Sequence, residues 1–193
     1  IGLDPHVSVI ATSARCLWLC RFVGQGLKAA REGIAQAASY DDPVSQCIAL
    51  IYLIPVLQWC GDLAGAAAHT EIVVQQAAKY SLAPYRAVSL ALKGESLVAS
   101  GDAALGVEML QEAVKAMDAN RYRIVTLATS RALAEGLAAA GRPGEGLVTI
   151  TEAATFAEQV GDIVWLPDLL RARGEILLAQ PVPDIASAEE CLL

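Results

Sequence analysis

A forty-residue repeat is the feature that most constrains the fold of this chain of 193 residues. Gly61, Gly101 and Gly141 recur at this spacing, and Arg21 and Pro181 continue the same register upstream and downstream. A small residue follows each of them five positions later; these residues are Gly26, Ala66, Gly106, Gly146 and Ala186. A period of this length, marked by glycine and small residues, is typical of arrays in which each repeat is one pair of helices.

Each repeat is predicted to form two antiparallel helices, A and B, joined at the glycine or its equivalent. Helix A is predicted over residues 5–20, 43–60, 84–100, 124–140 and 164–180. Helix B is predicted over residues 25–39, 63–80, 103–118, 143–160 and from 184 onward. Asp4-Pro5, Asp42-Pro43 and Pro143 are start signals, and the repeated glycines are left-handed stops. The small residue after each bend allows helix B to approach helix A closely.

Composition agrees with this pattern, because 55% of the residues are hydrophobic but only 5% are aromatic, and alanine favours helix. We therefore predict an all-α solenoid, a right-handed superhelix of five helix pairs whose last pair is truncated. It forms a single domain over residues 1–193, with repeats at 4–42, 43–82, 83–122, 123–162 and 163–193. The chain lacks an initiator Met and ends within the pattern, so we expect it to be a piece of a longer protein.

Residues 138–147, AAAGRPGEGL, place three glycines around the start of a predicted helix, which raises the alternative of a phosphate-binding loop. The segment lacks the Lys-Ser/Thr pair that reaches phosphate and magnesium in such loops. Gly141 and Gly146 also have counterparts in neighbouring repeats. The sequence therefore predicts a helix bend and no nucleotide cofactor.

Charge and hydropathy exclude two other classes of partner. The formal net charge is −7 and no cluster of Lys or Arg occurs, so direct nucleic-acid binding is not expected. Residues 43–61 carry no charge, and the length of this uncharged segment is close to that of a membrane-spanning helix. Polar residues and Pro55 interrupt this segment and no basic residue anchors it, which favours a buried helix over a membrane span. Pro55 is also expected to kink this helix.

Five cysteines match no disulfide framework, which indicates a reducing compartment and a cytoplasmic protein. Cys16 and Cys20 are one helical turn apart and could in principle hold a metal. They lack the second Cys/His pair of a zinc site, so we expect them to be buried small hydrophobic residues. His6 and His69 are isolated, and no catalytic arrangement can be assembled around them. We expect a non-catalytic chain without a metal or a cofactor.

The helix A surfaces carry the candidate binding residues, because helix A lines the concave face of stacked helix pairs. Glu95, Glu135 and Glu175 recur forty residues apart, and Arg131 and Arg171 precede the last two by four residues. One interpretation is a groove that recognises a basic or mixed-charge segment of a partner. The other is structural: the i,i+4 pairs each contribute about 0.3 kcal/mol, and Glu95 bridges to Arg131 on the neighbouring repeat.

Trp18 and Trp59 lie near their bends, where they could anchor a peptide or a planar ligand, or pack between repeats. Asp168 and Glu175 lie two turns apart and do not form a general acid/base pair. The candidate partner-binding residues are Arg15, Trp18, Gln58, Trp59, Glu95, Arg131, Glu135, Asp168, Arg171 and Glu175. The apolar end Cys191-Leu192-Leu193 offers an alternative, self-association through the last repeat as a homodimer.

The pattern of small residues that follows each glycine bend resembles the helix B signature of tetratricopeptide (TPR) repeats. The Leu-Gly position of helix A survives in part, as Lys93-Gly94 in the third repeat, and Ala134 fills it in the fourth. The period is longer than the usual thirty-four residues, so the helices are somewhat longer. This resemblance implies a repeat fold that binds a protein, a peptide or a small inducer in its groove.

A narrower resemblance lies in residues 2–34, GLDPHVSVIATSARCLWLCRFVGQGLKAAREGI, and residues 166–192, LPDLLRARGEILLAQPVPDIASAEECL. Both are similar to the C-terminal repeat domain of large bacterial signalling proteins; Arg21 and Val23 depart from that pattern. Those proteins join a winged-helix DNA-binding domain or a class III nucleotide cyclase to a regulatory ATPase module and then to the repeats. The resemblance implies the sensor domain of a transcriptional regulator, with the regulatory arm of an adenylate or guanylate cyclase as the alternative.

Overall fold

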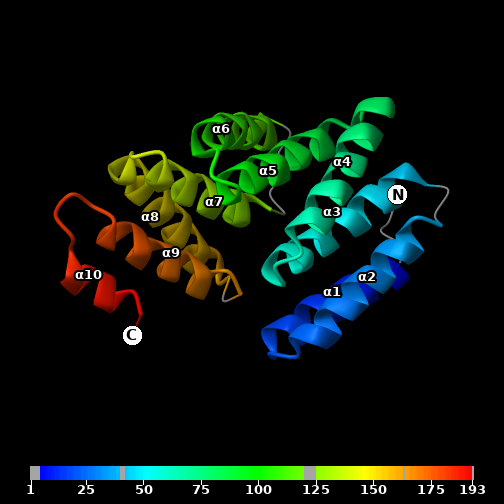
Figure 1. Ribbon diagram of the computed structural model, residues 1–193, viewed down its shortest axis with the longest axis horizontal. Helices are drawn as coiled ribbons and strands as arrows, with labels where there is room; N and C mark the ends of the chain where they lie inside the picture. Colours follow the sequence, from blue (N-terminus) through cyan, green and yellow to red (C-terminus); the bar gives the residue numbers. More distant parts are fainter. Residues whose placement is uncertain (1–4, 40–41, 120–124, 163, 193) are drawn as a thin grey trace. The chain divides into compact units, whose positions relative to one another are not determined.

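The computed structural model describes residues 5–39, 42–119, 125–162 and 164–192. Within these ranges it contains ten α-helices and no strand, which confirms the all-α prediction (Figure 1). The A helices are α1 (Pro5–Leu19), α3 (Pro43–Trp59), α5 (Ala83–Ala99), α7 (Thr126–Ala139) and α9 (Leu166–Leu178). The B helices are α2 (Val23–Ala37), α4 (Leu63–Lys79), α6 (Ala103–Ala119), α8 (Pro143–Val160) and α10 (Ile185–Glu190). The predicted boundaries agree to within two residues where they can be compared; Asp4, Ile124 and Leu193 lie outside the described residues.

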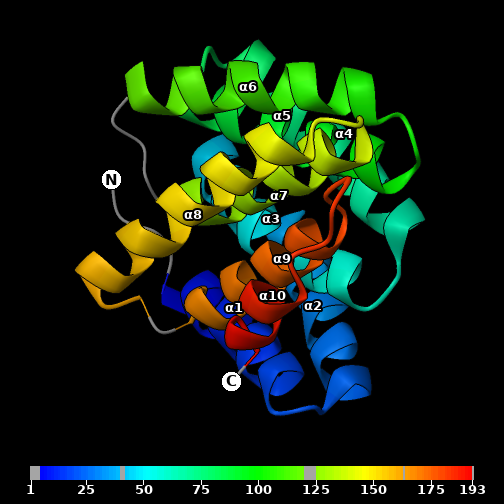
Figure 2. The same cartoon turned by 90° about the vertical axis from the view of Figure 1, so that its left-hand side faces the viewer.

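The chain divides into two compact units, Ile1–Ser89 and Leu90–Leu193, which we describe separately; α5 runs across the division. In the first unit α1 packs against α2 and α3, α2 packs against α3, and α3 packs against α4. In the second unit α7 packs against α6, α8 and α9, α9 also packs against α8, and α10 packs against α9 (Figure 2). Helices thus contact their near neighbours in the sequence, as expected for a repeat array.

The glycine bends adopt the predicted left-handed conformation. Gly61, Gly101 and Gly141 have φ angles of +78°, +97° and +79°, a region in which a Cβ is strained, and Arg21 has a φ of +66° at the equivalent position. Left-handed residues also join helix B to the next helix A, which the sequence pattern did not predict. These residues are Ser81 and Gly161, with φ angles of +54° and +69°.

Aspartates that follow several bends start the next helices. The Asp62 carboxylate accepts a hydrogen bond from the Gly65 N–H at 3.0 Å, and the Asp102 carboxylate accepts one from the Leu105 N–H at 3.4 Å. These contacts satisfy amide groups that have no partner inside the first turn of a helix. A left-handed residue followed by a capping aspartate therefore turns the chain and begins the next helix.

The small residues after the bends allow the backbones of paired helices to meet. A Cβ on Gly26 would lie 3.1 Å from the Ala14 carbonyl oxygen, and one on Gly146 would lie 2.7 Å from that of Ala134. A Cβ on Gly106 would lie 2.8 Å from the carbonyl oxygen of Gly94. The predicted close approach of helix B to helix A is confirmed at these three pairs.

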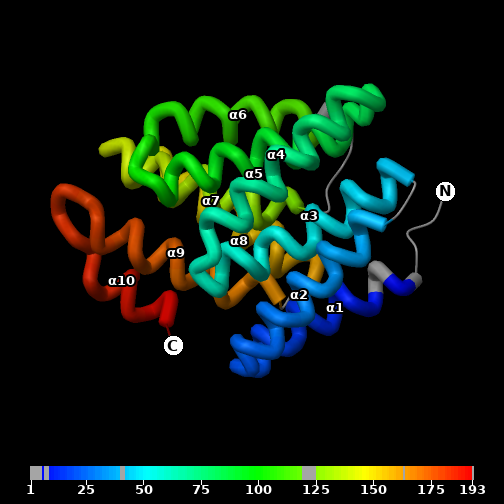
Figure 3. Tube along the Cα trace, turned by 45° about the vertical axis from the view of Figure 1, so that its right-hand side comes forward, coloured from blue at the N-terminus to red at the C-terminus, as the bar shows by residue number. Residues whose placement is uncertain are grey.

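The fifth pair departs from the prediction that Ala186 is its small contact residue. Ala186 is exposed, while Ala188 is buried and its carbonyl oxygen would lie 3.4 Å from a Cβ on Gly174. Six residues separate α9 from α10, against three between α1 and α2, and Figure 3 shows the wider loop. The reason is Pro181, whose ring fixes φ near −65° and so cannot form the left-handed bend found at Gly141.

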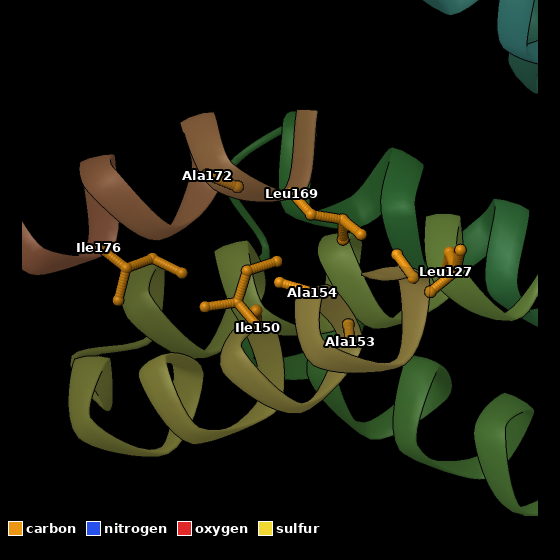
Figure 4. Packing of buried hydrophobic residues seen from close by; sticks show 9 residues of the cluster. Leu127, Ile150, Ala153, Ala154, Leu169, Ala172 and Ile176 are labelled. Carbon is orange, nitrogen blue, oxygen red and sulfur yellow. The ribbon is translucent and has the colours of Figure 1, made fainter. Parts of the chain in front are cut away.

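Small and branched residues fill the space between α7, α8 and α9 in the second unit. Leu127 on α7, Ile150 and Ala154 on α8, and Leu169 and Ile176 on α9 belong to one buried cluster (Figure 4). Alanine and glycine at the close approaches and leucine and isoleucine elsewhere explain how a chain with few aromatic residues fills its core.

Helix α3 is buried, as predicted, with side chains such as Leu53 and Ile54 almost fully removed from solvent. Pro55 lies inside α3, which continues to Trp59. Among the described residues, no helix has the combination of length and apolar character needed to cross a membrane.

Candidate functional site

Six charged residues of the second unit, on three successive A helices, form the candidate site. We call them the charge network: Glu95 on α5, Arg131 and Glu135 on α7, and Asp168, Arg171 and Glu175 on α9. The forty-residue repeat and the stacking of A helices bring these residues together, because equivalent residues of successive helices lie next to one another.

Arg131 connects all three helices. Its Nη2 lies 2.5 Å from Glu95 Oε1 on α5, and its Nη1 lies 2.5 Å from Glu135 Oε2 on α7. Its Nε lies 3.1 Å from Asp168 Oδ2 on α9. Only 11% of the Arg131 side chain is exposed, so this guanidinium is compensated by carboxylates rather than by water.

Arg171 repeats the same arrangement one repeat later. Its Nη2 lies 3.1 Å from Glu135 Oε1, and its Nη1 lies 2.6 Å from Glu175 Oε1. It also donates two hydrogen bonds to Asp168 Oδ1, from Nε at 2.9 Å and from Nη2 at 2.8 Å. Each arginine therefore pairs with a glutamate 36 residues before it and with a glutamate four residues after it.

Burial and charge oppose one another in the network. Burial raises the pKa of Glu95 above its ordinary value, and the nearby charge of Arg131 opposes this shift without cancelling it. Burial alone would lower the pKa of Arg131, but the carboxylates of Glu95, Glu135 and Asp168 outweigh it and raise the pKa. Hydrogen bonds to Glu175 and Asp168 likewise outweigh the burial of Arg171 and raise its pKa. Both guanidinium groups are therefore held in the charged form.

The network has more negative than positive charge, with four carboxylates and two guanidinium groups. Its accessibility increases toward the C-terminus, since 26% of the Glu95 side chain is exposed but 60% of that of Glu175. Both ion pairs expected within helices and the bridge from Glu95 to Arg131 are present. Sequence reasoning missed the contacts of Asp168 with the two arginines, because its counterpart one repeat earlier is Ala128. Binding of a partner along this face stays a prediction.

The candidate residues of the first unit form a separate aromatic cluster. The rings of Trp18 on α1 and Trp59 on α3 lie 4.8 Å apart between centroids with an angle of 38° between their planes. The guanidinium carbon of Arg15 lies 5.7 Å from the Trp59 ring centroid and 6.0 Å from that of Tyr52. These contacts join adjacent A helices, which is the packing alternative considered for the tryptophans. Tyr52 was not predicted, and Gln58 is half-buried beside Trp59.

The expectation that Cys16 and Cys20 are buried is wrong, because both are exposed. The buried face of α1 is formed by Ala11 and Ala14, and a rotation of about 100° per residue places Cys16 on the opposite side from Ala14. Within the described ranges, no three His, Cys, Asp or Glu residues form a group that could hold a metal ion.

Alternating A and B helices, left-handed bends and glycine contacts define a TPR-like helical-repeat fold, which is typically non-catalytic. The chain is similar to the crystal structure of nearly identical TPR-like repeats of a Podosopora anserina protein described as kinesin light chain. The identity is 19% over 97% of this chain and 92% of that chain, with a TM-score of 0.61. A Gln-to-Met variant of that protein gives 18% identity over 100% and 93% of the two chains, with a TM-score of 0.62. At this identity the likeness establishes the fold and leaves the function open.

No protein-family model matches the chain, and no curated protein matches it in sequence.

Proposed function

We propose that this chain is a protein-interaction module and that its charge network binds a partner segment containing Arg or Lys. TPR-like repeats generally mediate protein interactions, which supports the class of function. The observation that carries the finer proposal is the excess of carboxylates in the network together with the exposure of Glu175. Arg131 pairs with Glu95 of the preceding A helix, and Arg171 pairs with Glu135 in the same way. A cationic side chain of a partner that approaches Glu175 would form the next pair of this series.

Binding of labelled peptides tests this proposal. Fluorescence anisotropy compares peptides that differ only in whether they carry arginine, lysine, glutamate or glutamine at their charged positions. We expect the cationic peptides to bind with an affinity that falls as salt concentration rises. Equal binding of all peptides, or of none, would contradict a binding face selective for cations.

A matched pair of variants locates the site. Glu175→Gln removes one exposed charge from the network, and Glu152→Gln removes one from an exposed position on α8. We expect the first to weaken binding roughly two- to fivefold and the second to change it little, since one solvent-exposed charge pair contributes about 1 kcal/mol or less. Equal losses in the two variants would point to general electrostatic attraction.

We also propose that the module is the sensor domain of a cytoplasmic bacterial signalling protein, a transcriptional regulator with an ATPase module elsewhere in its chain. Occupancy of the charge network would shift that ATPase between its off and on states. The resemblance of residues 2–34 and 166–192 to such proteins supports this context. Sequencing the gene upstream of Ile1 tests it: a winged-helix domain followed by GxxxxGK[ST] is expected. A cyclase domain would favour the alternative parent, and neither domain would contradict both.

Self-association is a second candidate function, favoured by apolar exposure around α10. The exposed large residues there are Leu178, Val182, Ile185 and Leu192, and Val182 is 83% exposed. Contiguous exposed apolar groups are typical of association surfaces. Analytical ultracentrifugation should then detect a dimer that Val182→Ser with Ile185→Ser dissociates, whereas Val148→Ser on α8 should leave it intact. A monomer at all concentrations would exclude this function.

A further inference from the structure

Cys16 on α1 and Cys20, which directly follows the last residue of α1, form a pair of exposed cysteines. The Cys20 N–H donates a hydrogen bond to the Cys16 carbonyl at 2.9 Å, so the two residues are separated by one helical turn. Residues at this spacing have Cβ atoms about 5–6 Å apart. Because both side chains are exposed, each can change rotamer and bring its sulfur toward the other without disturbing packed neighbours.

We propose that Cys16 and Cys20 form a two-coordinate binding site for a soft monovalent metal ion, namely copper(I). Thiolates are the ligands that select copper(I) among the biological metals. A structural zinc site needs four ligands, and the described part of the chain groups no third His, Cys, Asp or Glu with the pair. Copper(I) accepts two thiolates in a linear arrangement, so this pair satisfies its coordination.

Binding releases one proton from each thiol, and two thiolates with one copper(I) leave a complex with a single negative charge. Arg15 precedes Cys16 and Arg21 follows Cys20, so each ligand has a basic neighbour in the sequence.

The other cysteines are poorer ligands. Burial raises the pKa of Cys47 to about 11, and it also raises that of Cys60, whose Sγ lies 4.0 Å from the Val23 carbonyl oxygen. Cys191 lies in the second unit, where it is half-buried at the end of α10. The exposed pair at the end of α1 is therefore the place where a thiophilic ion meets two accessible sulfurs.

An anaerobic titration with copper(I), using bicinchoninate as a coloured competing chelator, tests the site on the whole 193-residue chain. We expect one copper(I) per chain held by the pair. Cys16→Ser or Cys20→Ser should weaken binding roughly 100-fold or more, because the second thiolate acts at high effective concentration. Cys60→Ser and Cys191→Ser should leave the affinity unchanged.

Two rearranged variants separate the spacing of the thiols from their number. Thr12→Cys in the Cys20→Ser chain restores a one-turn pair with Cys16, and it should restore tight binding. Ser13→Cys in the Cys16→Ser chain also keeps two thiols, but it places them seven residues apart, so it should not restore tight binding. Thr12 and Ser13 are both exposed. Far-ultraviolet circular dichroism confirms folding of each variant. Equal affinities for the wild type and the Cys16→Ser, Cys20→Ser double variant, or loss of binding in Cys60→Ser, would overturn the assignment.

Discussion

Arg131 shows what a single residue contributes to a helical repeat. One guanidinium contacts a carboxylate on its own helix, one on the helix before and one on the helix after. Lysine could not replace it, because one ammonium group cannot present the planar set of donors that spans three helices. Since α7 lies between the other two A helices of the network, the ion pairs of Arg131 join both of these helices to α7, in addition to the apolar packing of the repeats.

Replacing Arg131 should therefore destabilise the second unit. Arg131→Ala leaves Glu95 partly buried without its cation, and we expect a loss of about 3 kcal/mol in the free energy of unfolding. Arg131→Lys should recover part of this loss. Arg142→Ala is the matched control, because Arg142 pairs with Glu145 at an exposed position, and it should cost less than about 0.5 kcal/mol. Urea denaturation measures all three, and equal losses at the two arginines would contradict the role of Arg131.

At this scale the sequence predicted part of the network and missed the rest. The i,i+4 pairs and the bridge from Glu95 to Arg131 follow from the repeat, because spacing alone brings those residues together. The contact of Asp168 with Arg131 depends on side-chain directions between helices, which no spacing encodes. The exposure of Cys16 depends on the rotation of α1 about its axis, and apolar residues on several faces of α1, such as the exposed Val9 and Leu19, left that rotation undetermined.

Among the elements, α8 shows why glycine is needed at only some positions. A Cβ on Gly146 would lie 2.7 Å from the Ala134 carbonyl oxygen, whereas one on Gly144 would have no atom of another group within 4 Å. Gly146→Ala should therefore cost about 1–3 kcal/mol through displacement of helix against helix. Gly144→Ala should stabilise the chain by up to about 1 kcal/mol through helix propensity. Thermal unfolding compares them, and effects of the same sign would show that the close approach is not required.

The start of α3 predicts a specific dependence of stability on pH. The Asp42 carboxylate accepts hydrogen bonds from the Ser45 hydroxyl and from the N–H groups of Ser45 and Val44, and these bonds lower its pKa. A lowered pKa in the folded state adds stability above the ordinary pKa of 3.8, and this stability is lost as pH falls through the folded value. The stability difference between wild type and Asp42→Asn should therefore shrink as the pH falls below about 4.

Urea titrations at several pH values test this expectation. Asn keeps a capping oxygen but does not titrate in this range, so the comparison isolates the charge. Ser45→Ala removes the hydroxyl that contributes most to the shift, and it should weaken the pH dependence of the difference. A constant difference between wild type and Asp42→Asn from pH 7 to pH 2 would contradict the prediction.

The order and boundaries of the helices could be predicted well, because glycine stops and Asp-Pro starts are local signals. The fifth bend could not be predicted in this way. Its register was extended from bends that need a positive φ, and Pro181 cannot adopt that conformation. The left-handed Ser81 was also missed, because serine carries no strong signal for that conformation.

For the whole molecule, the division into two units makes their stabilities separately measurable. Trp18 and Trp59 lie in the first unit and Trp165 in the second. In a repeat array a local change acts mainly through neighbouring repeats. We therefore expect Arg131→Ala to lower the urea midpoint of Trp165 fluorescence more than that of the other two tryptophans. Trp165→Phe and the Trp18→Phe, Trp59→Phe double variant separate the signals. Equal shifts in the urea midpoints of the Trp165 signal and of the Trp18 and Trp59 signal would show that the chain unfolds as one cooperative unit.

The pairing rule of the charge network has a consequence for how such a chain can change in evolution. Each arginine finds one partner 36 residues before it and one four residues after it, so the rule depends only on the repeat length. Tandem duplication of residues 123–162 would add one more arginine and glutamate in the same register, with every pair of this kind retained. The arginine of the first copy would have no aspartate partner on the following helix, because the counterpart of Ala128 stands there, whereas the arginine of the second copy would keep its contact with Asp168. Gene duplication could thus lengthen the charged surface of this protein without a new substitution.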